Sequence, residues 1–380
     1  MLQPHEPLLI IAQSGRFIAQ AAKRLGLTPL VIDCYGDVDT YDCAERVVTI
    51  ADLSLNELAP ALAQIKADNP TVKHVVYGSG FEYYPDSLAW LAQHYRLAGN
   101  SVTTFTRIYD KPNFFAVLSD LGIPFPETCF SEASLQRPGL LKPMLGQGGL
   151  GVVRAGQAQQ VGQDKYWQAY QLGVCRTALF IADGKHAKVL GYNTQWCQAT
   201  PEHEFLFAGI INSGGDLSVR QRRLVERWLV QLTLIFGLTG LNSVDFIQHG
   251  DELFVLEINP RLSASMQLYD ERLLLNHIYG RVALSYRVRF AGYSAYQLLY
   301  ASQDLVIPAS CNWPVECRDI PKAGVKCRQG QPICSMIAHA NTPEHVLNRL
   351  QQLSITLLTQ LTQETQCNTT LASISTLNLS

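Results

Sequence analysis

The sequence lacks several features that would place it in a specialised class of protein. Its ten cysteines include no C-x-x-C pair, which argues against zinc-ribbon and thioredoxin-type sites. No apolar run is long enough to span a membrane, and residues 1–7 lack the basic segment of a secretory signal. With a formal net charge of −2, there is no electrostatic case for nucleic acid or an anionic membrane as partner. We therefore expect a cytoplasmic protein with reduced cysteines.

What is present is typical of a globular chain with two or three domains, given its 380 residues. In the first hundred residues, apolar runs such as 8–12 alternate with helical patterns, and Gly26 ends the first of these helices. This alternation predicts a small parallel sheet flanked by helices. Further along, we expect an irregular stretch from Tyr192 to Asp216, and then a helix from Ser218 to about Phe236.

Two short segments follow strands in the first hundred residues. The Gln13–Arg16 turn has a single glycine, so a plain tight turn is favoured over a dinucleotide site. The segment Gly78–Glu82 also follows a strand, and ligands commonly bind at the carboxyl ends of parallel strands. It is a candidate wall of a ligand crevice, with simple turn chemistry as the alternative.

The most informative segment is an expected β-hairpin over residues 240–261. Glu257 and Asn259 are two residues apart, so on a strand they project from the same face. A carboxylate and an amide oxygen side by side are hard ligands, which suit a Mg²⁺ ion that also holds phosphates. Asp245, on the preceding strand, is the third candidate ligand. The alternative is a surface hairpin facing water, but its carboxylates lie among apolar residues and would need cationic partners.

Whether Asp245 can join the other two depends on the register of the hairpin. A loop of two or four residues centred on Gly250 and Asp251 would place Asp245 opposite Leu256, on the wrong face. An odd loop brings it to the ligand face, and Gly250 could supply the left-handed residue of a three-residue loop. The metal hypothesis therefore predicts an odd loop or a bulge.

A glycine-rich loop follows Lys142, which ends an apolar strand. Backbone N–H groups and a lysine ammonium together are a natural cradle for polyphosphate. A mobile hairpin tip is the alternative for the loop. Lys111 stands at the start of a helix, where a solvated lysine is the alternative to a ligand contact. The candidate residues of the loop are Gly146, Gln147, Gly148, Gly149 and Gly151.

Together, the segments Asp110–Val153 and Gly240–Arg261 resemble the ATP-grasp superfamily, and the similarity spans roughly Leu8 to Leu350. The resemblance implies an α/β and α+β fold class in which two subdomains clamp ATP. The implied domains are a Rossmann-like domain over 1–105, an ATP-grasp domain over 106–285 with subdomains at about 106–165 and 166–285, and a small mixed α/β domain over 286–380 with a weakly ordered tail.

The resemblance also implies roles for the candidate residues. Lys111 and Lys142 would contact ATP phosphates or the adenine edge, and the glycine-rich loop would close over the triphosphate. Arg261 would lie near the transferred phosphoryl group and act in catalysis with Lys142. The implied ligands of Mg²⁺, or Mn²⁺, are Asp245, Glu257 and Asn259.

The adenine contacts are the least defined part of the resemblance. Residues 167–173 look like the strand between subdomains whose backbone binds adenine, but they lack the glutamate that many members carry. We assign the adenine and ribose contacts to Gln168, Tyr170 and Gln171.

The activity implied is amide formation between a small-molecule carboxylic acid and an amine, through an acyl phosphate. The segments Gly78–Glu82 and Glu257–Arg261 further resemble ligases that build methanofuran- or tetrahydromethanopterin-type C1 cofactors. One alternative is a bicarbonate-activating carboxylase, which the C-terminal stretch Gly324–Leu350 favours. A non-catalytic ATP-binding sensor is the other. Arg176 and Arg272 are candidate substrate-carboxylate ligands, with ion-paired arginines as the alternative, and a homodimer is left open.

Overall fold

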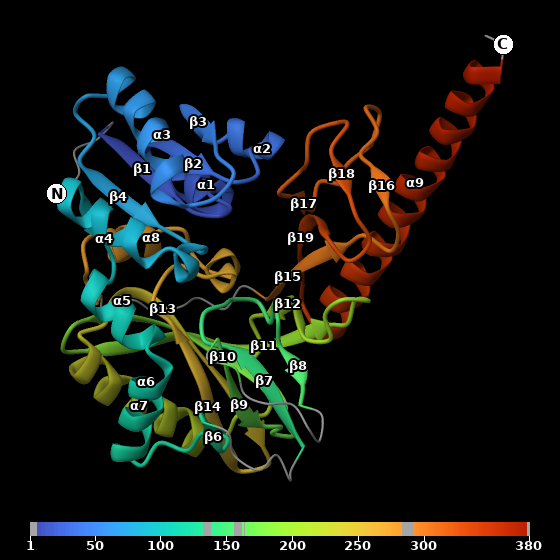
Figure 1. The fold of residues 1–380 in the computed structure, drawn as a ribbon. Coiled ribbons are helices and arrows are strands. Elements are labelled where there is room, and N and C mark those ends of the chain that lie inside the picture. Colours follow the sequence, from blue (N-terminus) through green and yellow to red (C-terminus); the bar gives the residue numbers. More distant parts are fainter. Residues whose placement is uncertain (1–5, 132–137, 156–161, 163, 283–291, 378–380) are drawn as a thin grey trace.

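A computed structural model describes residues 6–131, 138–155, 162, 164–282 and 292–377, with side chains up to residue 363. Its architecture confirms the expected mixed fold, in which a parallel α/β unit precedes larger antiparallel sheets (Figure 1). Within the described part of the chain, no helix is long and apolar enough to cross a membrane.

The N-terminal unit is a five-stranded parallel sheet with the order β3-β2-β1-β4-β5. Its central strands are apolar on both faces and fully buried, as expected for strands covered by helices on either side. The strands are β1 (Pro7–Ile11), β2 (Thr28–Asp33), β3 (Arg46–Thr49), β4 (His74–Tyr77) and β5 (Arg96–Ala98). The helices of residues 16–120 are α1 (Arg16–Arg24), α2 (Val38–Tyr41), α3 (Leu55–Asp68), α4 (Pro85–His94), α5 (Val102–Tyr109) and α6 (Lys111–Asp120).

A four-stranded antiparallel sheet follows, with the order β6-β9-β7-β8. The glycine-rich loop joins two neighbouring strands of this sheet, as the strand–loop–strand pattern predicted. The strands are β6 (Thr128–Cys129), β7 (Gly139–Pro143), β8 (Val153–Arg154) and β9 (Lys165–Ala169).

The largest sheet has eight strands in the order β14-β13-β10-β11-β12-β15-β19-β17, and every neighbouring pair of strands in it is antiparallel. It runs without a break across the domain boundary expected at residue 285. Its strands are β10 (Val174–Asp183), β11 (Ala187–Gln198), β12 (Leu206–Ile211), β13 (Thr239–His249), β14 (Glu252–Asn259), β15 (Tyr293–Tyr300), β17 (Cys317–Arg318) and β19 (Pro332–Ala340). A separate ribbon pairs β16 (Leu305–Val306) with β18 (Lys326–Cys327).

The irregular stretch expected from Tyr192 to Asp216 is wrong. Strand β11 continues to Gln198, and β12 occupies Leu206–Ile211. The end of β11 is polar and shows no clear alternation, and β12 is a short apolar run whose pattern alone does not identify a strand, so the sequence pattern missed both.

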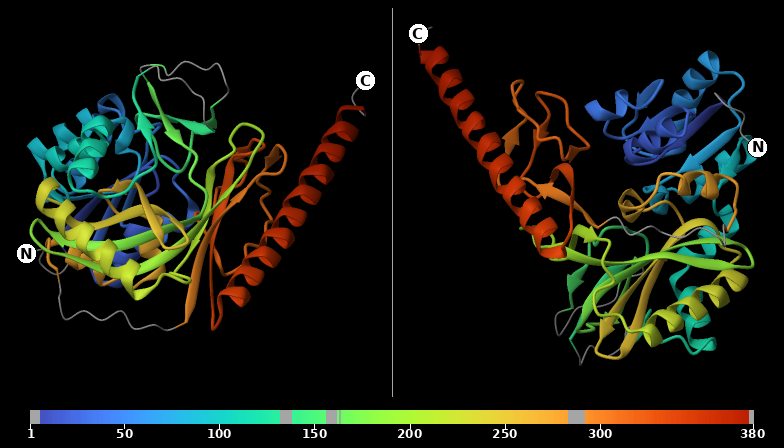
Figure 2. Two further views of the ribbon diagram at one scale, coloured as in Figure 1. Left: turned by 90° about the horizontal axis from the view of Figure 1, so that it is seen from below. Right: turned by 180° about the vertical axis from the view of Figure 1, so that it is seen from behind.

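Three helices complete the fold: α7 (Val219–Phe236), α8 (Leu273–Ile278) and α9 (Pro343–Leu377). The Thr/Ser-rich C-terminal segment is thus helical through Leu377. Helix α9 packs along β15 and β19 through a cluster that includes Leu350 and Met336. The N-terminal unit and residues 292–377 stand side by side above strands β10–β14 (Figures 1 and 2), and they are joined where the Val38 amide donates to the Ile320 carbonyl at 2.8 Å.

Helix α7 packs against one face of the large sheet. Ser218 and Gln221 form a capping box at its N-terminus, and Gly237, with φ of 68°, ends it in the left-handed conformation. Its inner face, including the fully buried Leu232, packs in the same core cluster as Phe180 of β10.

We predict that Leu232→Ala lowers the free energy of unfolding by about 2–5 kcal/mol, because a buried leucine leaves a cavity. The matched control is Leu234→Ala on the same helix, where the side chain is 59% exposed and the change should stay within about 0.5 kcal/mol. Urea denaturation measures both, and equal losses in the two variants would contradict this packing of α7.

A buried histidine joins α8 to β13. The ring Nδ1 of His277 accepts a hydrogen bond of 2.9 Å from the Leu241 amide, and the backbone of Gly99 and Gly240 lies against the ring. Burial lowers the pKa of His277 to about 4, so the ring is neutral in the folded protein. As the pH falls, the unfolded chain therefore binds a proton at His277 before the folded protein does.

The contribution of His277 to stability is present above its ordinary pKa of 6.5 and is lost as the pH falls toward 4. From pH 7 to pH 5, the wild type should lose about 2 kcal/mol more unfolding free energy than the His277→Gln variant. Urea denaturation at the two pH values tests this. Equal losses would show that the imidazole can be protonated in the fold.

Candidate functional site

A bulge in β14 sets the register of the hairpin. Asp245 pairs with Glu257, whereas the next residue of β13, Phe246, pairs with Val255. Leu256 is therefore the extra residue, and the turn between the strands has only two residues. The predicted choice between an odd loop and a bulge is thus confirmed as a bulge, with Asp245 opposite Glu257.

The two carboxylates lie in a partly buried polar group. Asp245 accepts hydrogen bonds from the Thr177 hydroxyl and from Asn259 Nδ2, the latter at 3.1 Å. Burial raises the pKa of Asp245 to about 7, and repulsion by Glu257 adds to the rise. The Lys111 ammonium lies 3.8 Å from Glu257 Oε2. A cation at this position would relieve the repulsion between the carboxylates.

The donor set suits Mg²⁺ when phosphate or water completes the coordination. In the described ranges, no group of three or more His, Cys, Asp or Glu side chains could hold a metal by itself. Two carboxylates and the Asn259 amide offer hard oxygen donors, fewer than the six that Mg²⁺ requires. The residues therefore fit a shared site, in which the protein supplies part of the shell and a bound phosphate the rest.

Lys142 is held by the strand next to it. Its ammonium donates to Gln168 Oε1 at 2.7 Å, and Gln168 Nε2 donates in turn to the Thr128 hydroxyl at 2.9 Å. Burial lowers the pKa of Lys142, and the charge of Lys111 also lowers it, while Glu257 opposes both. Gln168, expected near adenine, is buried and here orients Lys142.

Arg261 is tied to the N-terminal unit. Its Nε donates to Glu82 Oε1 at 2.5 Å, and Tyr109 and the Gly80 amide also donate to this carboxylate, at 3.1 and 2.6 Å. Burial alone lowers the pKa of Arg261, but the charge and hydrogen bond of Glu82, together with Tyr109 and Glu257, outweigh burial and raise the pKa overall. Arg261 Nη2 remains directed at Asn259 Oδ1, 3.3 Å away.

The glycine-rich loop closes against three parts of the chain. Gln147 donates to Gln13 of the N-terminal unit at 2.5 Å and accepts from Arg261 at 3.4 Å. The Gly148 carbonyl accepts from the Phe207 amide of β12 at 2.9 Å. The loop therefore spans the mouth of the site rather than projecting into solvent.

Beneath the loop is a cavity of about 1190 Å³. Of the residues predicted to bind ATP or the metal, Gly151 alone does not line it, although both of its neighbours do. The lining includes Lys111, Lys142, Gly146, Gln147, Gly148, Gly149, Gln168, Tyr170, Gln171, Asp245, Glu257, Asn259 and Arg261.

Some candidates lie elsewhere. Arg176 does not line this cavity and pairs with Asp216 at 2.8 Å. Arg272 forms an ion pair with Asp270 and is also absent from the lining. For both residues the structure matches the ion-paired alternative. Tyr170 lies at the cavity wall with the Arg154 guanidinium 5.0 Å from its ring centroid.

Sequence reasoning missed the residues that hydrogen-bond to the candidate site residues and hold them in position. Thr177 gave no signal, because a threonine within an apolar strand is common. Glu82 stood in a segment predicted to border a crevice, yet nothing in the sequence tied it to Arg261, 179 positions away. Only the fold brings such pairs together.

Residues 108–265 match the family model described as the ATP-grasp domain. Several solved structures share the fold over most of the chain. The biotin carboxylase domain of the Hydrogenobacter thermophilus 2-oxoglutarate carboxylase, solved with MgADP, ADP and bicarbonate, has a TM-score of 0.72 and 15% identity, and the match covers 92% of this chain and 90% of that one. Biotin carboxylase from Campylobacter jejuni gives 0.70 and 14%, with 91% and 90% covered.

N5-carboxyaminoimidazole ribonucleotide synthetase from Thermus thermophilus gives a TM-score of 0.67 and 15% identity, with 93% of this chain and 98% of that one covered. At such low identity these likenesses establish the fold alone. The family match and the fold agree on the same core: over residues 108–265 the protein carries an ATP-grasp domain.

Proposed function

We propose that the protein is an ATP- and Mg²⁺-dependent ligase that activates a carboxylate as an acyl phosphate for attack by an amine, forming an amide, ADP and phosphate. The observation that carries the proposal is the convergence on one cavity of two lysines, the Asp245–Glu257 pair and Arg261 beneath a glycine-rich loop. The elements that supply them are far apart in the sequence.

The charges of the site suit a triphosphate beside a carboxylate. A carboxylate is a poor electrophile until one of its oxygens becomes a good leaving group, which phosphorylation achieves. Phosphoryl transfer needs mainly positioning and charge neutralisation. Lys111 and Lys142 would neutralise phosphate oxygens, and the carboxylates with Asn259 would hold the ion. Bound Mg²⁺ would supply further neutralisation of the transferred group.

Arg261 and the loop would serve the second half of the reaction. With Glu82 fixing one edge of the guanidinium, the Nη2 group points toward Asn259 and so toward the proposed metal ligands. There it would bind the acyl oxygen or the phosphoryl group. Gln147, through its contacts with Gln13 and Arg261, would keep the loop closed and water away from the acyl phosphate.

A bicarbonate-activating carboxylase is the second candidate, because the fold of biotin carboxylase covers 92% of the chain and the Hydrogenobacter domain was solved with bicarbonate. Both reactions would use the same ATP- and metal-binding residues. The narrower assignment to a methanofuran- or tetrahydromethanopterin-type C1 cofactor pathway rests on the sequences of Gly78–Glu82 and Glu257–Arg261. We also propose a homodimer, the form recorded for the Hydrogenobacter domain, and a cytoplasmic location.

A screen of ADP release tests the proposal. The protein would be incubated with ATP and Mg²⁺ and with pools of carboxylic acids, with or without pools of amines, and in parallel with bicarbonate. The ligase predicts release that needs both an acid and an amine and stops when EDTA removes the metal. Release with bicarbonate in place of the acid would instead support the carboxylase.

Glu257→Gln should reduce ADP release by roughly 10²–10³-fold, because the amide removes a charge that the proposed metal site needs. Glu252→Gln, on the exposed start of the same strand, is the matched control and should leave the rate unchanged. Steady-state turnover under the screen's best conditions measures both. Unchanged turnover in Glu257→Gln would contradict the metal site, and no turnover in the wild type would favour the sensor.

Gly149→Ala should raise the KM for ATP by roughly tenfold or more, an effect of about 1.4 kcal/mol. A Cβ at this position would lie 1.9 Å from the Phe205 carbonyl oxygen, so the loop could not take its closed position. Gly148→Ala is the control, because its φ of 61° resembles the 76° of Gly149 but its Cβ would meet no atom within 4 Å. Equal effects in the two variants would point to backbone strain rather than loop closure.

A further inference from the structure

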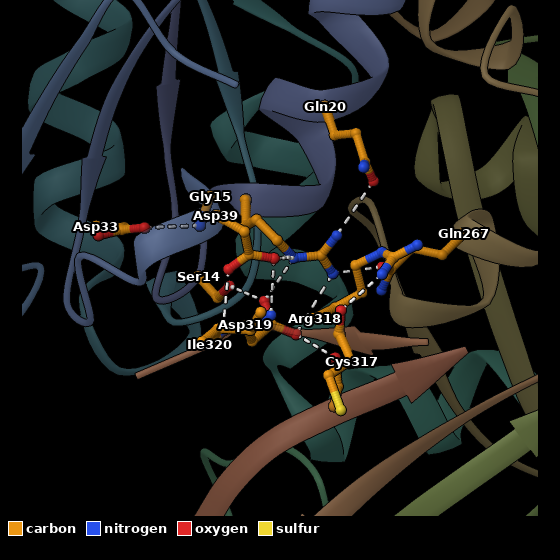
Figure 3. A network of polar contacts seen from close by, with 12 residues as sticks. Ser14, Gly15, Gln20, Asp33, Asp39, Gln267, Cys317, Arg318, Asp319 and Ile320 are labelled. Carbon is orange, nitrogen blue, oxygen red and sulfur yellow. Dashed lines mark hydrogen bonds and ion pairs between the residues drawn. The ribbon is translucent and has the colours of Figure 1, made fainter. Parts of the chain in front are cut away.

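The end of the cavity away from the metal-ligand hairpin is formed by a network around Arg16. Arg16 lies at the start of α1 and is only 1% exposed. Figure 3 shows that the network joins the N-terminal unit to the C-terminal segment. Arg16 donates to Asp319 Oδ1 at 2.8 Å and to Gln267 Oε1 at 2.6 Å, and its Nε lies 3.6 Å from Asp39. None of these residues has a part in the proposed phosphoryl transfer.

Asp319 is the centre of the network. Besides Arg16, the hydroxyls of Ser14 and Ser335 donate to it, the first at 3.2 Å. Burial alone raises the pKa of Asp319, but Arg16 and the hydroxyls of Ser335 and Ser14 together outweigh burial, so the pKa is lowered overall. Asp319 has a φ of 52°, which is unusual for a residue other than glycine, so its position is held by these contacts.

Two neighbouring carboxylates are also satisfied. Asp39 accepts from the backbone amides of Asp319 and Ile320 at 3.0 and 2.9 Å. Asp33 accepts from two glycine amides, those of residues 15 and 36, at 3.3 and 2.9 Å. All three carboxylates therefore have their partners within the protein.

Asp37 differs from them. It is 7% exposed and lines the cavity, and the described part of the chain offers its carboxylate no hydrogen bond or ion pair. It stands at the N-cap of α2 without making the capping bond. Burial raises the pKa of Asp37 to about 8, with repulsion from Asp319, Asp33 and Asp39 adding to the rise and Arg16 opposing it. A buried carboxyl without a partner is costly unless a ligand supplies one.

We propose that Asp37 binds a cationic ammonium group of the amine substrate other than the nitrogen that attacks the acyl phosphate, at the end of the cavity away from the hairpin that carries Asp245 and Glu257. This assignment rests on the proposed ligase function and names its substrate class as an amine with a second, positively charged nitrogen. The satisfied carboxylates around Asp37 add negative potential, and the aromatic side chains of Tyr35 and Tyr296 also line this part of the cavity.

A divalent metal fits this end of the cavity less well. Asp33, Asp39 and Asp319 already accept from backbone amides, hydroxyls and Arg16, so only Asp37 is available as a ligand. One carboxylate matches a single ammonium, whereas Mg²⁺ and Ca²⁺ take six or more oxygens. An anionic ligand would meet repulsion from the whole group.

The test measures binding without turnover. The probes are primary alkyl- and arylalkylamines, compared with the alcohols and carboxylates of the same carbon skeletons, titrated into the intact protein by calorimetry without ATP. We expect at least one amine to bind tenfold or more tightly than its matched alcohol and carboxylate. Asp37→Asn should remove that preference, whereas Asp42→Asn, at an exposed position five residues on, should keep it.

Asp37→Asn is also a suitable variant because it replaces a carboxyl whose charged form the surroundings disfavour with a neutral amide, so its melting temperature should not fall. If no amine is preferred, or if a folded Asp37→Asn keeps the preference, the proposal is overturned. The two experiments distinguish failure of this amine-site proposal from failure of the ligase function. If Asp37 is needed for amine binding but no ADP is released, the amine site stands and the ligase function is rejected. If ADP is released but Asp37→Asn binds the amine as tightly as the wild type, the ligase function stands and the amine site is rejected.

Discussion

Two carboxylates facing each other within a largely apolar sheet are the constraint on which the rest of the site depends. A bulge of one residue at Leu256 brings Asp245 opposite Glu257, and burial, with repulsion by Glu257 adding to it, raises the pKa of Asp245. Such an arrangement is stable only with cations nearby. Lys111 and Lys142 partly meet that need, which leaves the site suited to a divalent ion with phosphate. The repulsion between Asp245 and Glu257 would thus be relieved when a divalent ion binds together with the substrate phosphates.

Four parts of the chain each supply something that the others lack. The large sheet carries the acidic pair, and the small sheet carries Lys142 and the glycine-rich loop. The N-terminal unit orients Arg261 through Glu82 and holds the loop through Gln13. The C-terminal segment continues the large sheet and closes the far end of the cavity at Asp319. A single cavity therefore spans both the phosphoryl-transfer site and the proposed amine site.

The sequence predicted what depends on local pattern. The parallel N-terminal sheet, the strand–loop–strand unit after Lys142 and the need for a bulge or odd loop near Asp245 all follow from periodicity and side-chain direction. The strands between Tyr192 and Asp216 were missed because the end of β11 is polar and the apolar run of β12 is too short to identify a strand by its pattern alone. The pairings of Arg261 with Glu82 and of Arg16 with Asp319 join residues 179 and 303 positions apart, and no local signal specifies them. The domain boundaries and the roles of the site residues stay predictions.

Oxygen transfer from the acid to phosphate tests the central claim most directly. A turnover with ¹⁸O-labelled carboxylic acids, ATP, Mg²⁺ and amines would be followed by mass spectrometry of the phosphate released. The account predicts phosphate that carries one ¹⁸O from the acid, because the carboxylate oxygen attacks the γ-phosphate before the amine displaces it. Unlabelled phosphate would contradict activation of a carboxylic acid at this site, as would label that appears only in a parallel turnover with ¹⁸O-labelled bicarbonate.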